Sequence, residues 1–219
     1  MNRVGCAIAA GLLLAGTTAG AQSADGFRDS WFWGAKVGAV SIGTAETARE
    51  AKPSFGGEWL ITRTVGALYL SADFTSVEMI GSVPDPAAFS GRRLVRFNNL
   101  RRVGFAGLVY PRTFGPLRPY GGVGLSLVVI GSAEALPDTV NGTQPTLAVE
   151  DRVEQARSRS AIQGIAGVQG QFGRLAPFAQ MTFMPASGRF LVNDRSLQFF
   201  EAGVRYNFGS SKDRTGRGR

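Results

Sequence analysis

Apolar residues alternate with small or polar residues along much of this chain, most clearly in the closing stretch EAGVRYNFG, residues 201–209. The apolar positions of that stretch are Ala202, Val204, Tyr206 and Phe208. Because successive side chains of a β-strand point to opposite faces, strict alternation predicts a strand with two different faces. The same pattern recurs along the chain, so it predicts an all-β fold.

Eight segments carry the pattern. We expect strands at residues 32–43, 54–63, 66–78, 94–110, 118–132, 160–172, 175–184 and 197–209. The stretch RLVRFNNL, residues 93–100, breaks the alternation and predicts a β-bulge.

The links between these segments alternate in length. Residues 64–65, 111–117 and 173–174 form short turns, whereas 44–53, 80–93, 133–159 and 185–196 form longer polar loops. Tight turns at one end and longer loops at the other are typical of an up-and-down outer-membrane β-barrel. One helix is expected, at 147–157 within the longest loop. Because long loops on a rigid scaffold often carry function, we expect 133–159 to form the external contact surface.

Alternation alone does not say which face is inside, because soluble barrels have apolar interiors and membrane barrels have apolar exteriors. The less apolar face is small and sparsely charged, as at Gly122, Gly124 and Ser126. A water-exposed face would carry many long Lys and Glu side chains. We therefore predict an eight-stranded antiparallel transmembrane barrel. The alternative is a soluble periplasmic or secreted ligand-binding barrel of lipocalin type, to which Gly57-Glu58-Trp59 has a short similarity.

Charged side chains on the predicted inner face are the candidate site. They are Lys36, Glu58, Asp73, Arg102, Glu201 and Arg205. Buried charges are tolerated only when they are paired. Since the first, second and eighth strands are neighbours in a closed barrel, Lys36, Glu58, Glu201 and Arg205 are expected to form an ion network that plugs the lumen. For Arg102 the alternative is a position at a rim of the barrel, in contact with water.

The first 21 residues have the features of a secretory signal peptide, with Arg3, an apolar run and Ala19-Gly20-Ala21 before the cleavage point. The predicted division is a signal peptide at 1–21, a lead-in at 22–30, a barrel at 31–209 and a basic tail at 210–219.

Residue types that are missing limit the chemistry. The chain has no histidine, and its one cysteine, Cys6, lies within the predicted signal peptide. Triads and His-metal sites that need an imidazole are therefore excluded, and we expect no catalytic residue, metal or cofactor. The net charge of +8 has two interpretations. The first is that arginines line the loops and a solvated face of the barrel. The second is that the protein binds anionic partners, which for an exported chain are lipopolysaccharide phosphates rather than nucleic acid.

Three stretches resemble the small eight-stranded outer-membrane barrels of the OmpA, OmpX and OmpW type. They are WFWGAKVGAVSIG (31–43), RPYGGVGLSL (118–127) and AGVRYNFG (202–209). The resemblance implies an outer-membrane location. It also implies that Tyr206 and Phe208 belong to the signal read by the barrel-assembly machinery, although the chain continues to residue 219.

The same family includes structural, adhesive and solute-passing proteins and a few lipid A-modifying enzymes, which generally rely on a histidine. We therefore expect a non-enzymatic, monomeric outer-membrane barrel that contacts lipids and lipopolysaccharide.

Overall fold

The computed structural model describes residues 27–138, 140, 142–186, 190–192 and 196–210. The predicted signal peptide and residues 211–219 of the predicted tail lie outside the described residues. The elements are β1 (Ser30–Ile42), β2 (Glu50–Thr62), β3 (Gly66–Pro84), β4 (Arg92–Val109), β5 (Leu117–Ala135), α1 (Leu147–Ala156), β6 (Ser158–Gly170), β7 (Leu175–Met184) and β8 (Leu197–Ser210).

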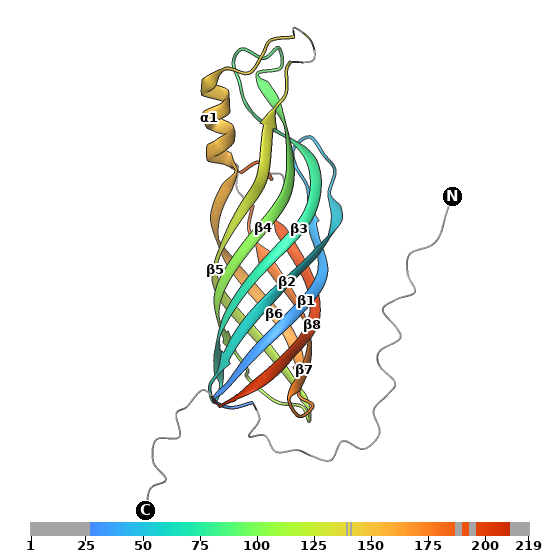
Figure 1. Ribbon diagram of the computed structural model, residues 1–219, viewed down its shortest axis with the longest axis vertical. Helices are drawn as coiled ribbons and strands as arrows, with labels where there is room; N and C mark the ends of the chain where they lie inside the picture. Colours follow the sequence, from blue (N-terminus) through green and yellow to red (C-terminus); the bar gives the residue numbers. More distant parts are fainter. Residues whose placement is uncertain (1–26, 139, 141, 187–189, 193–195, 211–219) are drawn as a thin grey trace, which may run out of the picture.

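The strands form one closed antiparallel barrel (Figure 1). Each strand pairs with its neighbours in chain order, and β8 pairs with β1, where Val37 lies opposite Ala202. Closure pairs the backbone groups between strands and leaves no open sheet edge to face lipid. The predicted fold class is confirmed.

Short turns and long loops occupy opposite ends of the barrel, as the link lengths predict (Figure 1). Two of the short turns share the pattern Phe-Gly-x-Leu, at 114–117 and 172–175, and in each the Phe and Leu form an isolated β-bridge. Their glycines, Gly115 and Gly173, have φ angles of 59° and 62°. Side chains other than glycine rarely adopt that left-handed region, so glycine permits the tight turn.

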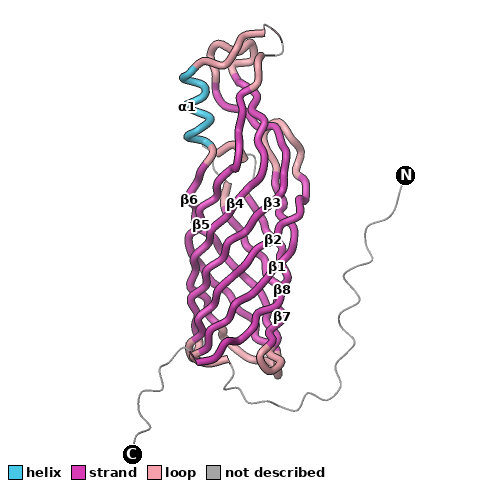
Figure 2. The backbone as a smooth tube through the Cα atoms, viewed as in Figure 1, coloured by secondary structure: helices cyan, strands magenta, loops and turns pink. Residues whose placement is uncertain are grey.

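Three adjacent strands are longer than a membrane crossing needs. β3, β4 and β5 have 19, 18 and 19 residues, whereas about 9–11 residues cross the hydrocarbon. Their ends form an extension beside which α1 lies (Figure 2). Residues 80–84 and 92–93 are strand, so the loop predicted at 80–93 is too long. Residues 80–84 were missed because this stretch contains Gly81 and Pro84, which are typical of turns.

The predicted break in alternation is present in β4, where Asn99 has a φ of 58°. The extra residue lies on the neighbouring strand, because the register shifts between Thr75 and Glu78 so that two residues of β3 face Asn99. The bulge predicted in β4 is therefore in β3. Side chains before and after Asn99 therefore alternate in opposite phase, so both Phe97 and Arg102 point inward and are buried.

The outer face is apolar, which confirms the predicted orientation. We call the exposed apolar side chains of this face the apolar belt, and they include Trp33, Val37, Leu68, Leu70, Val103, Phe105, Val123, Leu125, Leu127, Ile162, Met181, Phe183, Phe200, Val204 and Phe208. Val123 is 71% exposed and Val103 is 55% exposed. No helix in the described part of the chain is long and apolar enough to cross a membrane.

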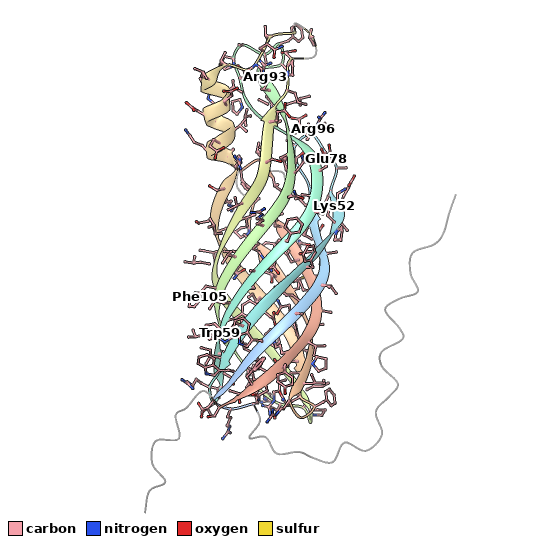
Figure 3. All side chains as sticks on the ribbon, viewed as in Figure 1. Lys52, Trp59, Glu78, Arg93, Arg96 and Phe105 are labelled. Carbon is pink, nitrogen blue, oxygen red and sulfur yellow. The ribbon has the colours of Figure 1, made fainter. Side chains whose placement is uncertain are left out.

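Aromatic side chains gather near the short-turn edge of the belt. Trp59, labelled in Figure 3, lies near the short-turn end, with ring centroids 5.2 Å from Trp31 and 6.0 Å from Trp33. Tyr206 and Phe208 are a second pair, 5.0 Å apart. Aromatic girdles of this kind flank the apolar band of outer-membrane barrels.

The interior is layered, and two of its layers were not expected. Apolar clusters lie above and below the polar centre. The cluster toward the long loops includes Val40, Ile42, Val95, Phe97, Ile130, Val149, Val153, Leu191 and Phe199. The cluster toward the short turns includes Phe27, Phe32, Leu60, Leu108, Tyr110 and Tyr120. The inner face is therefore polar only at mid-height, because the long strands and α1 also need a core of their own.

Candidate functional site: a charged network in the lumen

Two cations and two anions form a closed ring inside the barrel. The Lys36 Nζ atom lies 2.8 Å from Asp73 and 2.9 Å from Glu201. The Arg102 Nη2 atom lies 2.6 Å from Asp73 and 2.9 Å from Glu201. Each cation thus contacts both anions, and the four side chains come from β1, β3, β4 and β8.

A second ion pair lies beside this ring. Arg205 on β8 donates a hydrogen bond from Nε to the Glu58 carboxylate on β2. Its other nitrogens donate to Gln169 Oε1 and to Tyr120 Oη, and the Phe178 ring lies 4.0 Å from the guanidinium carbon. All the partners around Arg205 therefore point into the lumen from neighbouring or facing strands.

Neutral side chains join the ring to this pair. Tyr69 Oη accepts hydrogen bonds from Lys36 Nζ and Gln180 Nε2 and donates one to Glu58 Oε2, at 3.0 Å. Gln180 Nε2 also donates to Glu201 Oε2 at 2.9 Å. Tyr69 and Gln180 thus turn two ionic groups into one continuous network.

The network is electrically balanced and excluded from water. It contains Lys36, Arg102 and Arg205 against Glu58, Asp73 and Glu201, and each of these residues is at most 6% exposed. Desolvating a charge costs several kcal/mol. Several partners for each charged group therefore offset the cost of desolvating it. The same contacts hold each side chain in place.

Inward-facing glycines make room for these long side chains. A Cβ atom at Gly34 would lie 3.0 Å from Glu58 Cγ and 3.1 Å from Arg205 Cγ. A Cβ atom at Gly56 would lie 2.3 Å from an Asp73 carboxylate oxygen. Part of the chain's high glycine content therefore follows from the ion network.

The structure places all six predicted site residues inside the barrel. Asp73 and Arg102 belong to the network as well as the four residues expected to form it. Arg102 is 1% exposed, so its alternative position at a rim in water is wrong. The reason is the change of phase at Asn99, after which the even-numbered residues of β4, including Arg102, face inward.

Sequence inspection did not assign four members of the network to the site: Tyr69, Tyr120, Gln169 and Gln180. The signal for Gln180 was available, because it alternates with the outward-facing Ala179 and Met181. Tyr206 and Phe208 face outward as predicted, while their role as an assembly signal stays a prediction. No group of three or more acidic, histidine or cysteine side chains in the described ranges is arranged to hold a metal ion.

A separate ionic clamp fixes the long-loop end. Arg93 is fully buried and donates hydrogen bonds from Nε to Asp85 Oδ2, at 2.8 Å, and from Nη1 to the backbone oxygen of Thr143. The Ala87 N–H donates to Asp85 Oδ1 at 3.0 Å. That N–H and the Arg93 guanidinium lower the pKa of the Asp85 carboxyl below its usual value. The clamp ties the β3–β4 loop to the β5–α1 loop.

Two solved structures share this architecture. Neisserial surface protein A is 14% identical, with a TM-score of 0.54, over 81% of this chain and 97% of that one. Ail, the attachment invasion locus protein of Yersinia pestis, is 11% identical, with a TM-score of 0.50, over 83% of this chain and 99% of that one. The chain has the fold of a small outer-membrane β-barrel. No protein-family model and no curated protein sequence matches it.

The resemblance read from the sequence is thus confirmed at the level of fold. A closed barrel of this type, with an apolar belt outside and a buried polar layer inside, is a membrane-spanning structure. This fold agrees with the predicted location in the bacterial outer membrane.

Proposed function

We propose that this protein is a non-enzymatic outer-membrane barrel with a closed lumen, which serves as a rigid mount for the structure at its long-loop end. We call that structure, formed by the upper parts of β3–β5, α1 and the adjoining loops, the outer cap. The observation that carries the proposal is the six-charge network across the lumen, between two apolar layers. Its role is adhesive or structural.

A role in solute passage is less well supported. A solute crossing the lumen would have to separate Arg102 from Asp73 and Glu201 and displace apolar side chains above and below them. Each buried charge left without its partner costs about 3–5 kcal/mol. These side chains therefore block the passage of solutes rather than select among them.

The outer cap is built to present a surface. Val149 and Val153 anchor α1 in the upper apolar cluster, and the clamp of Arg93 and Asp85 holds the loops. Ail, a protein of similar fold, is described as an attachment and invasion protein, which supports an adhesive role here as a proposal. The predicted external contact region, 133–159, lies largely within this cap.

The soluble-barrel alternative does not suit the outer face. A lipocalin-like protein would have to expose the whole apolar belt to water, far beyond the patches usual for soluble monomers. We further propose that the protein is a monomer, that it contacts outer-membrane lipids and lipopolysaccharide, and that the barrel-assembly machinery inserts it.

Single-cysteine labelling tests whether the outer cap is exposed on the cell surface. The only cysteine of the chain is Cys6, so Ser90→Cys in the β3–β4 loop and Thr64→Cys in a short turn each introduce one reactive site in the predicted mature protein. In intact cells a membrane-impermeant maleimide should label Ser90→Cys and should label Thr64→Cys only after permeabilisation. Labelling of Thr64→Cys alone in intact cells would refute the proposed orientation.

A further inference from the structure

Arg101 is an arginine on the outer face of β4, at the point where the apolar belt ends. It is exposed and shares its face with Val103 and Phe105 of the belt. Its cross-strand neighbours are Phe74 on β3 and Val129 on β5. Arg101 therefore has apolar surface on three sides.

Beyond Arg101, the same face becomes polar. Exposed side chains there include Arg96, Glu78, Ser132 and Glu134. Figure 3 shows Arg96 and Glu78 toward the long-loop end and Phe105 farther down the barrel. Arg101 lies between Phe105 and Arg96 in β4, so it marks the boundary between the two surfaces.

The depth of Arg101 matches a membrane interface. From Val109 at the short-turn end of β4 to Arg101, the strand advances by eight residues. At a rise of about 3.3 Å per residue and a tilt of about 40°, this is roughly 20 Å along the barrel axis. The apolar band of such barrels is about 25 Å tall. Arg101 is therefore expected at the level of the lipid headgroups.

Arg101 has no counter-ion among the described residues. Arg96 lies 3.9 Å from Glu78, and Arg92 lies 3.7 Å from Glu46. By contrast, no ion pair or hydrogen bond joins Arg101 to another described residue. Its guanidinium is therefore available to an anion from outside the chain.

We propose that Arg101 binds the phosphate group of a lipid in the outer leaflet. The planar guanidinium donates two parallel hydrogen bonds to a phosphate, and the aliphatic stem lies along apolar surface while the charged end reaches the headgroups. The exposed hydroxyl of Ser76, the next outward position above Phe74, is a further donor at this level. This inference rests on the proposed membrane orientation.

Vesicles of defined composition test the proposal. The full-length protein and the variants Arg101→Gln, Arg101→Lys and Arg96→Gln are folded into phosphatidylcholine vesicles, with or without phosphatidylglycerol. A third arm adds inorganic phosphate to the phosphatidylcholine vesicles. The temperature at which the folded band disappears in gel electrophoresis is measured. Arg96→Gln is the matched control, because it removes one charge from the same strand and face but lies above the belt.

Phosphatidylglycerol should raise the unfolding temperature of the parent protein and of Arg96→Gln by about 2–4 °C. Arg101→Gln should lose most of this shift, and Arg101→Lys should keep part of it. An undiminished shift in Arg101→Gln would overturn the proposal, and so would an equal shift with inorganic phosphate alone. Failure of the parent protein to fold into any vesicle would instead count against the proposed membrane function.

Discussion

The Arg102 guanidinium lies 2.9 Å from the Glu201 carboxylate, although the two residues belong to strands on opposite sides of the barrel. In a closed ring of eight strands, β4 and β8 are four steps apart in either direction. The pair therefore spans the lumen. The network therefore reaches across the lumen between facing strands.

Removing Arg102 should be costly. In Arg102→Met the carboxylates of Asp73 and Glu201 keep only Lys36 as a cationic partner, so we expect a loss of about 3–5 kcal/mol in the free energy of unfolding. Urea unfolding in lipid vesicles measures it. Arg96→Met, which alters an exposed arginine on the same strand, should stay within about 0.5 kcal/mol. A similar loss in the free energy of unfolding for both variants would contradict a stabilising role for the network.

The Tyr69 hydroxyl should matter because it joins the two ionic groups. Tyr69→Phe leaves Glu58 without one donor and Lys36 and Gln180 without one acceptor, and this should cost about 1–3 kcal/mol. Tyr206→Phe removes the same hydroxyl from an outward-facing tyrosine, where it accepts an exposed hydrogen bond from Arg174 at 3.3 Å, and should be nearly neutral. Unfolding midpoints of the two variants under one set of conditions provide the comparison. Equal midpoints would count against the bridging role.

A charge introduced into the apolar belt should destabilise the folded barrel, and the effect should grow with its depth in the membrane. Val103→Arg places a cation on the outer face of β4 within the belt. The free energy of unfolding should fall by about 2–4 kcal/mol. Ile80→Arg places the same charge on the outer face of the β3 extension, beyond the belt, and should have little effect. Folding yield in vesicles, followed by gel mobility, distinguishes them. A larger defect in Ile80→Arg would mean that the membrane lies elsewhere on the barrel.

Acid should loosen the outer cap through Asp85. Its lowered pKa in the folded protein means that the unfolded state binds the proton more readily, so the stabilisation is present above the ordinary aspartate value of about 4. It should fade as the pH falls below that value, through the lowered pKa.

Hydrogen exchange at the Ala87 and Ala88 amides should therefore be slow and constant from neutral pH to about pH 4, after correction for intrinsic rates, and should accelerate below it. Asp85→Asn should exchange faster at neutral pH and lose the acid dependence. Protection that increased on acidification would contradict the clamp.

Much of the fold could be predicted because the period of two is a direct consequence of strand geometry. Strand number, closure, orientation and the helix at 147–157 followed from alternation and link lengths. The phase also placed Lys36, Glu58 and Glu201 inside, because the inner face of a narrow barrel admits few charges. The break in phase at RLVRFNNL was also visible, although the extra residue that accompanies it lies on β3.

The pairing inside the lumen could not be predicted in the same way. Contacts such as Arg102 with Glu201 depend on the tilt and stagger of strands far apart in sequence, which alternation does not encode. The apolar layers were missed because Phe97 and Phe199 lie on the face read as polar. The Arg93–Asp85 clamp joins two loops, and loops carry no periodicity.

Planar-bilayer recording of the folded, full-length protein tests most directly whether the lumen is closed. Bilayers that contain many inserted barrels should show no large, steady open-channel current, because the ion network and the two apolar layers fill the lumen. A large and steady conductance from the unmodified protein would contradict the plug and would favour solute passage as its function.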